Sequence, residues 1–274
     1  MTTVADHPPG LPDFITRVKT RAETAFLYVG GLTDLARQTM QQLRKGPLER
    51  SLLNAQFDQI GFKSLSIVII TSAFIGMVLA LQTAYALEDF GGKLFVGTIV
   101  SLSLVRELAP VLMSLMVGGR VGAGMAAELG TMKVTEQIDA MRALGTDPVR
   151  KLVAPRLVAL LVTLPLLTIV ADAVGIGGGW VVSTQFFGIN SSSFMAAVWD
   201  GLSTDDIIGG FVKTSAFALI IGTVACHKGL GTEGGTVGVG RSTTSAVVAT
   251  SILIIVADYF ITRGLQLIFG LPTG

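Results

Sequence analysis

Residues 64–86 read SLSIVIITSAFIGMVLALQTAYA, and this stretch decides the fold. It carries no charged side chain, and Gln82 is its only amide. A helix needs about 20 predominantly apolar residues to cross the ~30 Å hydrocarbon core of a bilayer. The stretch is therefore long enough and apolar enough to be a transmembrane helix.

Four further stretches have the same length and character, at 94–119, 157–183, 207–226 and 244–269. The whole chain is 50% hydrophobic and 14% charged, with a mean hydropathy of +0.67. A soluble domain carries about 25% charged residues, so much of this surface must face something other than water. The expected fold is an all-α integral membrane protein with five transmembrane helices.

The distribution of Lys and Arg predicts the orientation, because cytoplasmic loops carry an excess of them. Sixteen lie in the segments 1–63, 120–156 and 227–243, whereas the two opposite connections hold only Lys93. We therefore expect a cytoplasmic N-terminus and a C-terminus on the outer side. The net charge of +1 gives no reason to expect nucleic-acid binding.

The chain before the first span predicts separate helices. Residues 1–10 are polar and are expected to be a disordered tail, followed by interfacial or cytoplasmic helices at 11–63 and the five-span domain at 64–274. Apolar residues recur every three or four positions from Phe14 to Val29, which favours an amphipathic helix in the membrane interface. We expect Gly30-Gly31 to break it and a second helix to begin near Thr33. The alternative is a cytoplasmic helix packed on the protein.

The polar segment 128–156, ELGTMKVTEQIDAMRALGTDPVRKLVAPR, is expected on the cytoplasmic side. Its apolar residues, Val134, Ile138, Met141 and Leu144, have helical spacing and predict a short amphipathic helix. We expect Thr135 to cap its start, Gly145 to end it and a turn to follow at 146–148. A motor protein could push on such a helix, although a plain connecting loop would have a similar pattern.

The sequence has no motor of its own. It contains no G-x-x-x-x-G-K-[ST] phosphate loop. The glycine-rich stretch 229–240, GLGTEGGTVGVG, lacks the Lys-Ser/Thr pair and is interpreted as a tight turn before the fifth span. If transport is driven by ATP, the ATPase is another chain.

Long motifs in the chain resemble those of the MlaE/YrbE-type ABC transporter permeases. They include R-E-L-x-P-V at 106–111, A-E-L-G-x-M-x-x-T-E-Q at 127–137 and G-x-D-P at 145–148, within a run from 102 to 156. The resemblance extends through FIGMVLALQ at 74–82 to GRSTTSAVV at 240–248, and so covers most of residues 60–270.

The resemblance implies a homodimeric permease of the bacterial inner membrane that moves phospholipids or other large lipids to or from the outer envelope. It implies a separate cytoplasmic ABC ATPase, which binds ATP and Mg, and an Mce-domain lipid-binding protein on the outer side. It implies an N-terminal interfacial helix before five spans, and no catalysis or cofactor in this chain. The helix of the 128–156 segment would be the coupling helix that contacts the ATPase, with coupling residues Thr135, Glu136, Gln137, Asp139, Arg142 and Asp147.

Charges inside the spans are candidates for function, because each costs several kcal/mol unless it faces protein or water. Arg106 and Glu107 lie mid-span and point about 100° apart, so each needs a partner elsewhere. Pro110 cannot donate to the Arg106 carbonyl, which predicts a kink. We expect these residues to form a lipid-headgroup site, in which the cations attract phosphate. Its expected residues, which match family positions at the lipid cavity, are Gln82, Tyr85, Arg106, Glu107 and Lys213.

A structural network that locks the second span to the first and fourth is the alternative interpretation of these charges. Asp172 and Asp258 are expected to be structural acids, partnered by Arg, Ser or Thr. One cysteine, Cys226, and two distant histidines make a metal site unexpected. Rival functions are an ion-coupled secondary carrier, an intramembrane enzyme and a non-transporting scaffold. Five spans do not divide into the equal repeats of many carriers, and no Ser/His pair accompanies the acids.

Overall fold

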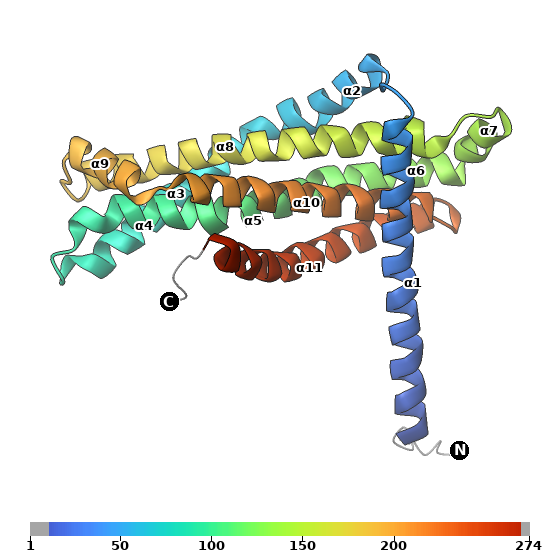
Figure 1. Ribbon diagram of the computed structural model, residues 1–274, viewed down its shortest axis with the longest axis horizontal. Helices are drawn as coiled ribbons and strands as arrows, with labels where there is room; N and C mark the ends of the chain where they lie inside the picture. The colour runs from blue at the N-terminus through green and yellow to red at the C-terminus, as the bar shows by residue number, and fades with distance from the viewer. Residues whose placement is uncertain (1–10, 270–274) are drawn as a thin grey trace, which may run out of the picture.

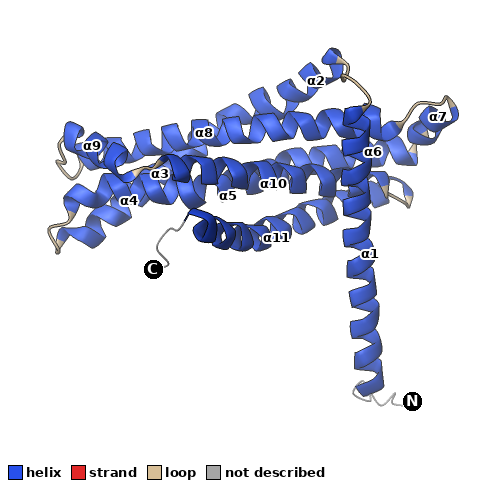
Figure 2. Cartoon of the chain, viewed as in Figure 1, coloured by secondary structure: helices blue, strands red, loops and turns tan. Residues whose placement is uncertain are grey.

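The computed structural model describes the backbone of residues 11–269 and the side chains of residues 28–268. Within this part of the chain every regular element is helical (Figure 2). Five helical segments are long and apolar enough to cross a membrane. The predicted fold class, an all-α membrane protein with five spans, is thus confirmed. The predicted disordered tail at 1–10 lies outside the described residues.

The five spans are composite. The first contains α2 (Arg50–Phe57), η1 (Asp58–Phe62) and α3 (Lys63–Glu88). The second contains η2 (Lys93–Phe95), α4 (Val96–Ser103), η3 (Leu104–Leu108), α5 (Ala109–Val117), η4 (Gly118–Gly122) and α6 (Ala123–Val134). The third contains η5 (Val149–Val153) and α8 (Ala154–Gln185), and the last two are α10 (Thr204–Leu230) and α11 (Gly235–Phe269).

The spans run lengthwise beside one another, with α7 (Gln137–Ala143) and α9 (Ser191–Gly201) at opposite ends of the bundle (Figure 1). Even the shortest span, with 27 residues, is about 40 Å long at about 1.5 Å per residue. The spans therefore extend beyond the ~30 Å that a hydrocarbon core requires. Helix α9 was not predicted, because residues 184–206, between the predicted third and fourth spans, were expected to form only a connection.

The second span ends later than predicted. The 120–156 connection was expected to begin at Arg120, but the helix continues to Val134 and the next span begins at Val149. Close packing explains the extension. Gly118 and Gly122 lie against the Ile221 side chain of α10, so this polar and glycine-rich sequence is held in a helix by its neighbour. The predicted glycine-rich turn is also shorter, since α11 already begins at Gly235.

The predicted break at Gly30-Gly31 is wrong, because α1 (Leu11–Arg44) is a single helix that crosses the bundle near its α7 end (Figure 1). Gly31 has a packing role instead. A Cβ there would lie 2.6 Å from Cε1 of His227 in α10, so the imidazole ring would have to move if Gly31 had a side chain. Tyr28 packs edge-on against the same ring, with centroids 5.5 Å apart, and Lys228 Nζ lies 4.5 Å from the Tyr28 centroid. Whether α1 also lies in the membrane interface stays a prediction.

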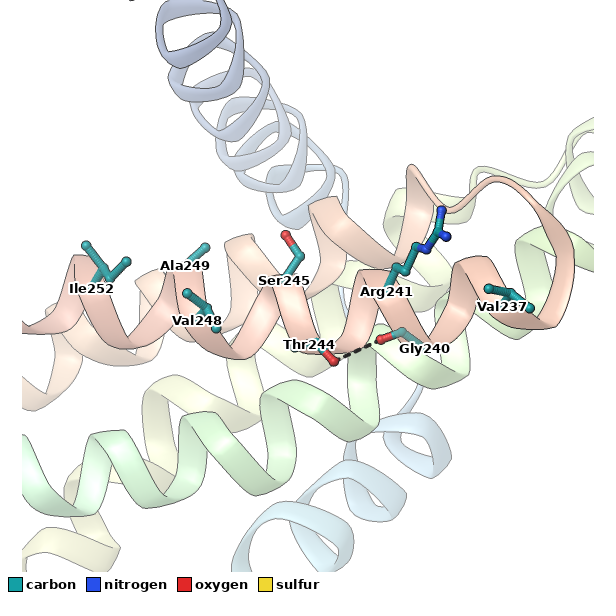
Figure 3. Close-up of a pocket in the computed structure, with 8 residues that line it drawn as sticks. All are labelled: Val237, Gly240, Arg241, Thr244, Ser245, Val248, Ala249 and Ile252. Atoms are coloured by element: carbon teal, nitrogen blue, oxygen red, sulfur yellow. Dashed lines mark hydrogen bonds between the residues drawn. The ribbon is translucent and has the colours of Figure 1, made fainter. Parts of the chain in front are cut away.

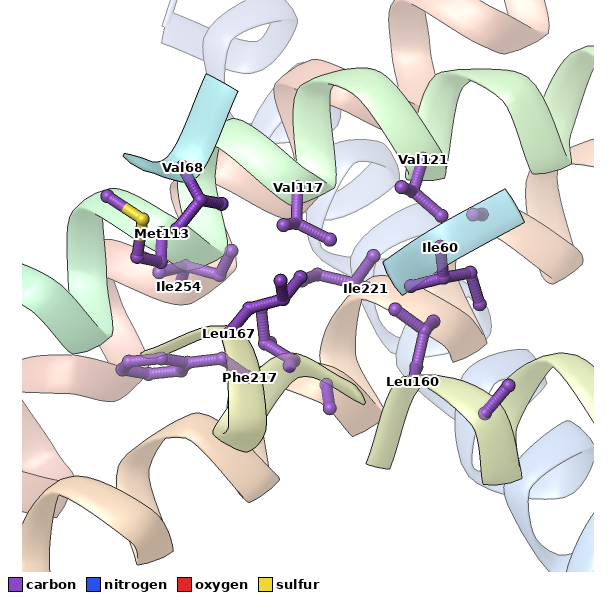
Figure 4. Close-up of a cluster of buried hydrophobic side chains, with 14 of the residues drawn as sticks. Ile60, Val68, Met113, Val117, Val121, Leu160, Leu167, Phe217, Ile221 and Ile254 are labelled. Carbon is purple, nitrogen blue, oxygen red and sulfur yellow. The ribbon is translucent and has the colours of Figure 1, made fainter. Parts of the chain in front are cut away.

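The main hydrophobic core fills the centre of the bundle (Figure 4). It joins all five spans through fully buried side chains, among them Ile60, Met113, Leu160, Phe217 and Ile254. A second cluster lies toward the α9 end, where Phe194 packs with the outer parts of α3, α4 and α8. These cores fix the relative positions of the spans on which the polar site depends.

Helices α3 and α8 make the closest backbone contact in the bundle. A Cβ on Gly178 would meet the Ala73 carbonyl at a separation that real side chains do not reach, whereas Gly177 faces open space. Gly76 meets the Gly175 carbonyl in the same way. The glycines of α8 therefore permit helix contact, as small residues commonly do in membranes.

We expect Gly178→Ala to destabilise the protein by about 1–3 kcal/mol or more, because the obstructing atom is backbone and cannot rotate away. Gly177→Ala is the matched control, and should be neutral or slightly stabilising, since alanine favours a helix by up to ~1 kcal/mol. Thermal unfolding of the detergent-solubilised variants measures both. Equal midpoints for the two variants would contradict the close contact between α3 and α8.

Candidate functional site

Charged side chains from three spans meet at the π-helical turn η3. Glu107 Oε2 accepts a hydrogen bond from Lys213 Nζ of α10 at 2.6 Å, and Asp258 Oδ1 of α11 lies 3.3 Å from the same nitrogen. The Lys213 side chain is only 3% exposed. A buried ammonium with two carboxylates is thus the electrostatic link between spans two, four and five. Asp258 was expected to pair with Arg, Ser or Thr, and its partner is instead Lys213.

Pro110 explains a third contact of Lys213. Proline has no N–H to donate to the carbonyl four residues earlier, which is that of Arg106. Lys213 Nζ donates to this carbonyl oxygen at 2.8 Å. The lysine therefore satisfies a backbone group that the proline leaves without its usual helical donor.

These contacts leave Lys213 little freedom to bind a ligand. Its side chain is only 3% exposed, and two of the three N–H donors of an ammonium group are given to the Arg106 carbonyl and the Glu107 carboxylate. The Asp258 carboxylate lies 3.3 Å away as an ion-pair partner without a hydrogen bond. The expectation that Lys213 attracts lipid phosphate directly does not fit this geometry. Lys213 therefore has a structural role, in which it holds Glu107 and η3 in position.

Arg106 pairs with an acid that the sequence analysis did not select. Its Nε donates to Asp206 Oδ1 at 2.5 Å, and Asp206 Oδ2 accepts from the N–H and the hydroxyl of Ser203. Ser203 and Asp206 form a capping box at the start of α10. The spacing Ser-x-x-Asp is the signal that could have found this residue. The Arg106 side chain remains 40% exposed, so the outer edge of its guanidinium is accessible.

A small polar pocket of about 70 Å³ opens beside these residues. Its charged lining residues are two cations and three acids: Arg106, Lys213, Glu107, Asp205 and Asp206. Glu107 is 43% exposed, and its second oxygen, Oε1, lies 3.4 Å from the Thr262 hydroxyl, which donates to it. The pocket therefore offers one guanidinium edge and the exposed carboxylates of Glu107 and Asp205 to a ligand, rather than a concentration of positive charge.

Gln82 and Tyr85 are not brought to this pocket. Both are exposed on α3, and neither lines the pocket. Tyr85 packs edge-on against Phe187, with ring centroids 5.1 Å apart. Of the five residues predicted for the site, the structure thus gathers Arg106, Glu107 and Lys213, adds Asp206 and Asp258, and leaves these two apart.

The predicted cytoplasmic helix is present as α7, at one end of the bundle. Thr135 does not cap it, because its hydroxyl donates to the Thr131 carbonyl of α6. Glu136 begins α7 in the left-handed conformation, with φ of 60°. It is the only residue other than glycine with positive φ in the described part of the chain, and it makes the turn from α6 to α7 sharp.

Most of the predicted coupling residues contact their own loop. Asp139 pairs with Lys133 at 2.8 Å and with Arg142 at 3.2 Å, and the hydrogen bond from Lys133 holds the pKa of Asp139 below its usual value. The side-chain amide of Gln137 donates to the Thr135 hydroxyl at 3.0 Å. These contacts stiffen α7 against the end of α6.

Gly145 ends α7 as predicted, with φ of 74°. The turn predicted at 146–148 lies instead at 144–145, and the helical conformation resumes at Pro148. Asp147 accepts hydrogen bonds from the Val149 N–H and from the side-chain amide of Gln42 in α1. Leu144 departs from the predicted pattern, since it is 83% exposed while Ile138 is fully buried. The loop therefore presents one large apolar side chain at its tip.

Three further observations concern a metal site, the cysteine and Asp172. They contain no group of three or more His, Cys, Asp or Glu side chains that could hold a metal ion. Cys226 is a buried free thiol. Asp172 lies in α8, and its Oδ1 is buried without a hydrogen-bond partner among the described residues, unlike the partnered structural acid that the sequence predicted.

Comparison with known proteins identifies the family of the chain. The family model described as permease MlaE matches residues 53–263. A probable ABC transporter permease protein of Rickettsia typhi is 45% identical over 80% of this chain and 85% of its own length. The intermembrane phospholipid transport system permease protein MlaE of Haemophilus influenzae is 37% identical over 77% of this chain and 81% of its own.

A plant relative also matches. The chloroplastic protein TRIGALACTOSYLDIACYLGLYCEROL 1 of Arabidopsis thaliana is 37% identical over 82% of this chain and 64% of its own length. The family match covers all five spans, the charge cluster and α7 together. The chain is therefore a member of the MlaE permease family of ABC transporters.

Proposed function

We propose that this chain is the permease subunit of an ABC transporter that moves phospholipid, or another large lipid, between the inner membrane and the outer envelope of a bacterium. The polar pocket at Arg106 and Glu107 carries the proposal, because it places a guanidinium edge and a carboxylate among apolar spans. The name of the Haemophilus influenzae relative, an intermembrane phospholipid transport system permease protein, supports it.

The residues of the pocket divide into ligand-binding and positioning roles. The free guanidinium edge of Arg106 donates hydrogen bonds to a lipid phosphate, as arginine does well. Glu107 accepts from a donor group of the same head. Asp206 fixes the position of the Arg106 side chain through an ion pair, and Lys213 fixes η3 through its hydrogen bond to the Arg106 carbonyl. Gln82 and Tyr85 contact the lipid further along α3. No covalent step occurs in this chain.

ATP hydrolysis drives the cycle from a separate cytoplasmic ATPase, which binds ATP and Mg. Helix α7 is the coupling helix. Its Asp139 contacts Lys133 of α6, through which movement reaches span two, and Asp147 in the loop after α7 contacts Gln42 of α1. This role places the N-terminus and α7 in the cytoplasm and the C-terminus on the outer side. An Mce-domain lipid-binding protein then receives or delivers lipid at the α9 end.

A homodimer is part of the proposal, and α11 supplies a surface for it. One face of α11 lines an open hollow of about 760 Å³ (Figure 3). The face combines apolar Val237, Val248 and Ile252, each more than half exposed, with small Gly240 and Ala249. Small residues beside apolar ones allow close helix contact in a membrane, so a second copy of α11 fits this face.

We expect Arg106→Gln to lower the amount of phospholipid that purifies with the transporter by at least about ten-fold, because a charge-assisted hydrogen bond contributes about 1.5–3 kcal/mol. Arg106→Lys should retain part of it, since lysine lacks the planar fork. Quantitative lipid mass spectrometry of the purified complex, with unfolding midpoints as a check on folding, makes the measurement. Arg37→Gln, on the exposed surface of α1, is the matched control.

Three results would overturn the proposal. If Arg106→Gln kept both bound lipid and lipid transfer, the cluster would be only a structural network. If lipid transfer continued with a hydrolysis-deficient ATPase but stopped when the ion gradient was dissipated, the chain would be a secondary carrier. If no lipid transfer accompanied either energy source in reconstituted vesicles, the chain would be a scaffold.

A further inference from the structure

A second cavity, of about 430 Å³, lies between α8, α9 and α10. Gly210 lines both this cavity and the polar pocket at Arg106, so the two sites lie back to back across α10. The volume falls in the range of about 300–1,000 Å³ that is usual for small-molecule sites. Nothing in the proposed transport cycle uses this cavity.

Asp172 is the only charged side chain in the cavity wall. Its Oδ1 is buried and has no hydrogen-bond partner among the described residues. The threonines of the wall do not supply one, because the Thr168 hydroxyl donates to the Leu164 carbonyl and the Thr214 hydroxyl donates to the Gly210 carbonyl. A buried acceptor without a donor is costly. Asp172 is only partly buried and lines the cavity, so a ligand that brings a donor can pair with this carboxylate.

The other residues of the cavity wall favour a ligand that is mainly apolar. Ile169, Trp199 and Phe211 line the cavity and are each more than half exposed, so the cavity opens sideways through an apolar rim. In a membrane this rim faces lipid rather than water. A ligand that enters here comes from the bilayer, and its apolar part covers the rim while its head reaches Asp172.

We propose that this cavity binds one membrane lipid with a small hydrogen-bond-donating head, a hydroxyl or an ammonium. A phosphodiester head does not fit, since its oxygens only accept hydrogen bonds and its charge repels the Asp172 carboxylate. The site is distinct from the polar pocket at Arg106 and Glu107, where Arg106 provides a hydrogen-bond donor for the phosphate of a transported lipid. It can therefore be occupied whether or not the chain carries phospholipid.

Photocrosslinking of the full chain in its native membranes tests the proposal. The probes are diazirine-labelled hexadecanol, hexadecylamine and dihexadecyl phosphate, a phosphodiester without a hydroxyl or amine, with labelled peptides mapped by mass spectrometry. We expect the alcohol, the amine or both to label the cavity segments of α8, α9 and α10. Asp172→Leu should lower that labelling at least about ten-fold, the loss expected for a hydrogen bond to a charged group.

Two further variants are needed. One distinguishes loss of ligand binding from misfolding of Asp172→Leu, and the other distinguishes an ammonium head group from a hydroxyl head group. Ala173→Phe fills the mouth of the cavity from an exposed position and keeps Asp172, and it should lower the labelling similarly. Asp172→Asn keeps an acceptor without charge, so it should weaken an ammonium head much more than a hydroxyl head. Thr168→Val is the matched control and should label normally, because the Thr168 hydroxyl is already bonded within its own helix.

Equal labelling by dihexadecyl phosphate would overturn the proposal, as would unchanged labelling in Asp172→Leu and Ala173→Phe. Neither result concerns the polar pocket at Arg106 and Glu107. That pocket is tested by the amount of phospholipid that purifies with the Arg106→Gln variant. Conversely, loss of phospholipid transport in Arg106→Gln leaves the labelling at Asp172 in place. The two proposals thus fail by different measurements.

Discussion

The Lys213→Met variant is expected to lose about 3 kcal/mol or more of stability and much of its folded yield. Methionine has a similar length but removes the ammonium that faces Glu107, Asp258 and the Arg106 carbonyl. Removing one partner of a buried ion pair costs about 3–5 kcal/mol, because the other charge stays uncompensated. The lower value applies here, since Glu107 and Asp258 are 43% and 22% exposed. Total stabilities are only about 5–15 kcal/mol, so this loss is severe.

Thermal unfolding in detergent, together with the yield of monodisperse protein, measures the effect. The triple variant Lys213→Met, Glu107→Gln, Asp258→Asn is the matched control, because it removes all three charges and leaves no uncompensated one. We expect it to recover most of the lost stability while phospholipid binding stays low. A Lys213→Met protein as stable as the parent would show that the ammonium is not the link between the three spans.

The five spans could be predicted because hydropathy is a property of the local sequence. Each span needs only enough consecutive apolar residues, and residues 64–86 show this without reference to any neighbour. The ends of the spans could not be predicted in the same way. The helix from Gly118 to Val134 contains Arg120, Glu128 and Lys133, and its glycines pack against Ile221 more than 90 residues away.

The helix break predicted at Gly30-Gly31 is the clearest error among the predictions from sequence, and it has a physical cause. A Gly-Gly pair weakens a helix by its flexibility, so a break at Gly30-Gly31 was expected. The same lack of a side chain admits His227 against Gly31. Which consequence prevails depends on whether another helix occupies the space, and the sequence does not contain that information in any local pattern.

The candidate site was predictable in part. A charge within an apolar span is visible in sequence, which identified Arg106, Glu107 and Lys213. Their partners depend on how the spans pack. The Arg106 carbonyl needs a donor because of Pro110, but only the position of α10 beside η3 makes Lys213 that donor. Gln82 has a suitable depth in its span, yet depth does not determine the side of the helix on which it lies.

The Leu144→Asp variant is expected to separate the permease from its ATPase while leaving the membrane domain intact. Leu144 is 83% exposed at the end of α7, so the substitution removes no packing within the chain. An apolar side chain held out at a loop tip has a physical use if a partner buries it, and full burial of leucine contributes about 1.5–3 kcal/mol. A carboxylate in the same place would also have to be desolvated.

We therefore expect the affinity for the ATPase to fall by at least about 30-fold, which corresponds to about 2 kcal/mol. Pull-down of the ATPase and lipid-stimulated ATP hydrolysis measure the loss, and bound phospholipid should stay at the parental level. Leu94→Asp is the matched control, because Leu94 is 65% exposed in η2, at the end of the bundle away from α7. Normal ATPase binding by Leu144→Asp would exclude α7 as the principal contact, and the permease would then have to receive the movement through α1, whose Gln42 already contacts Asp147 of the same loop.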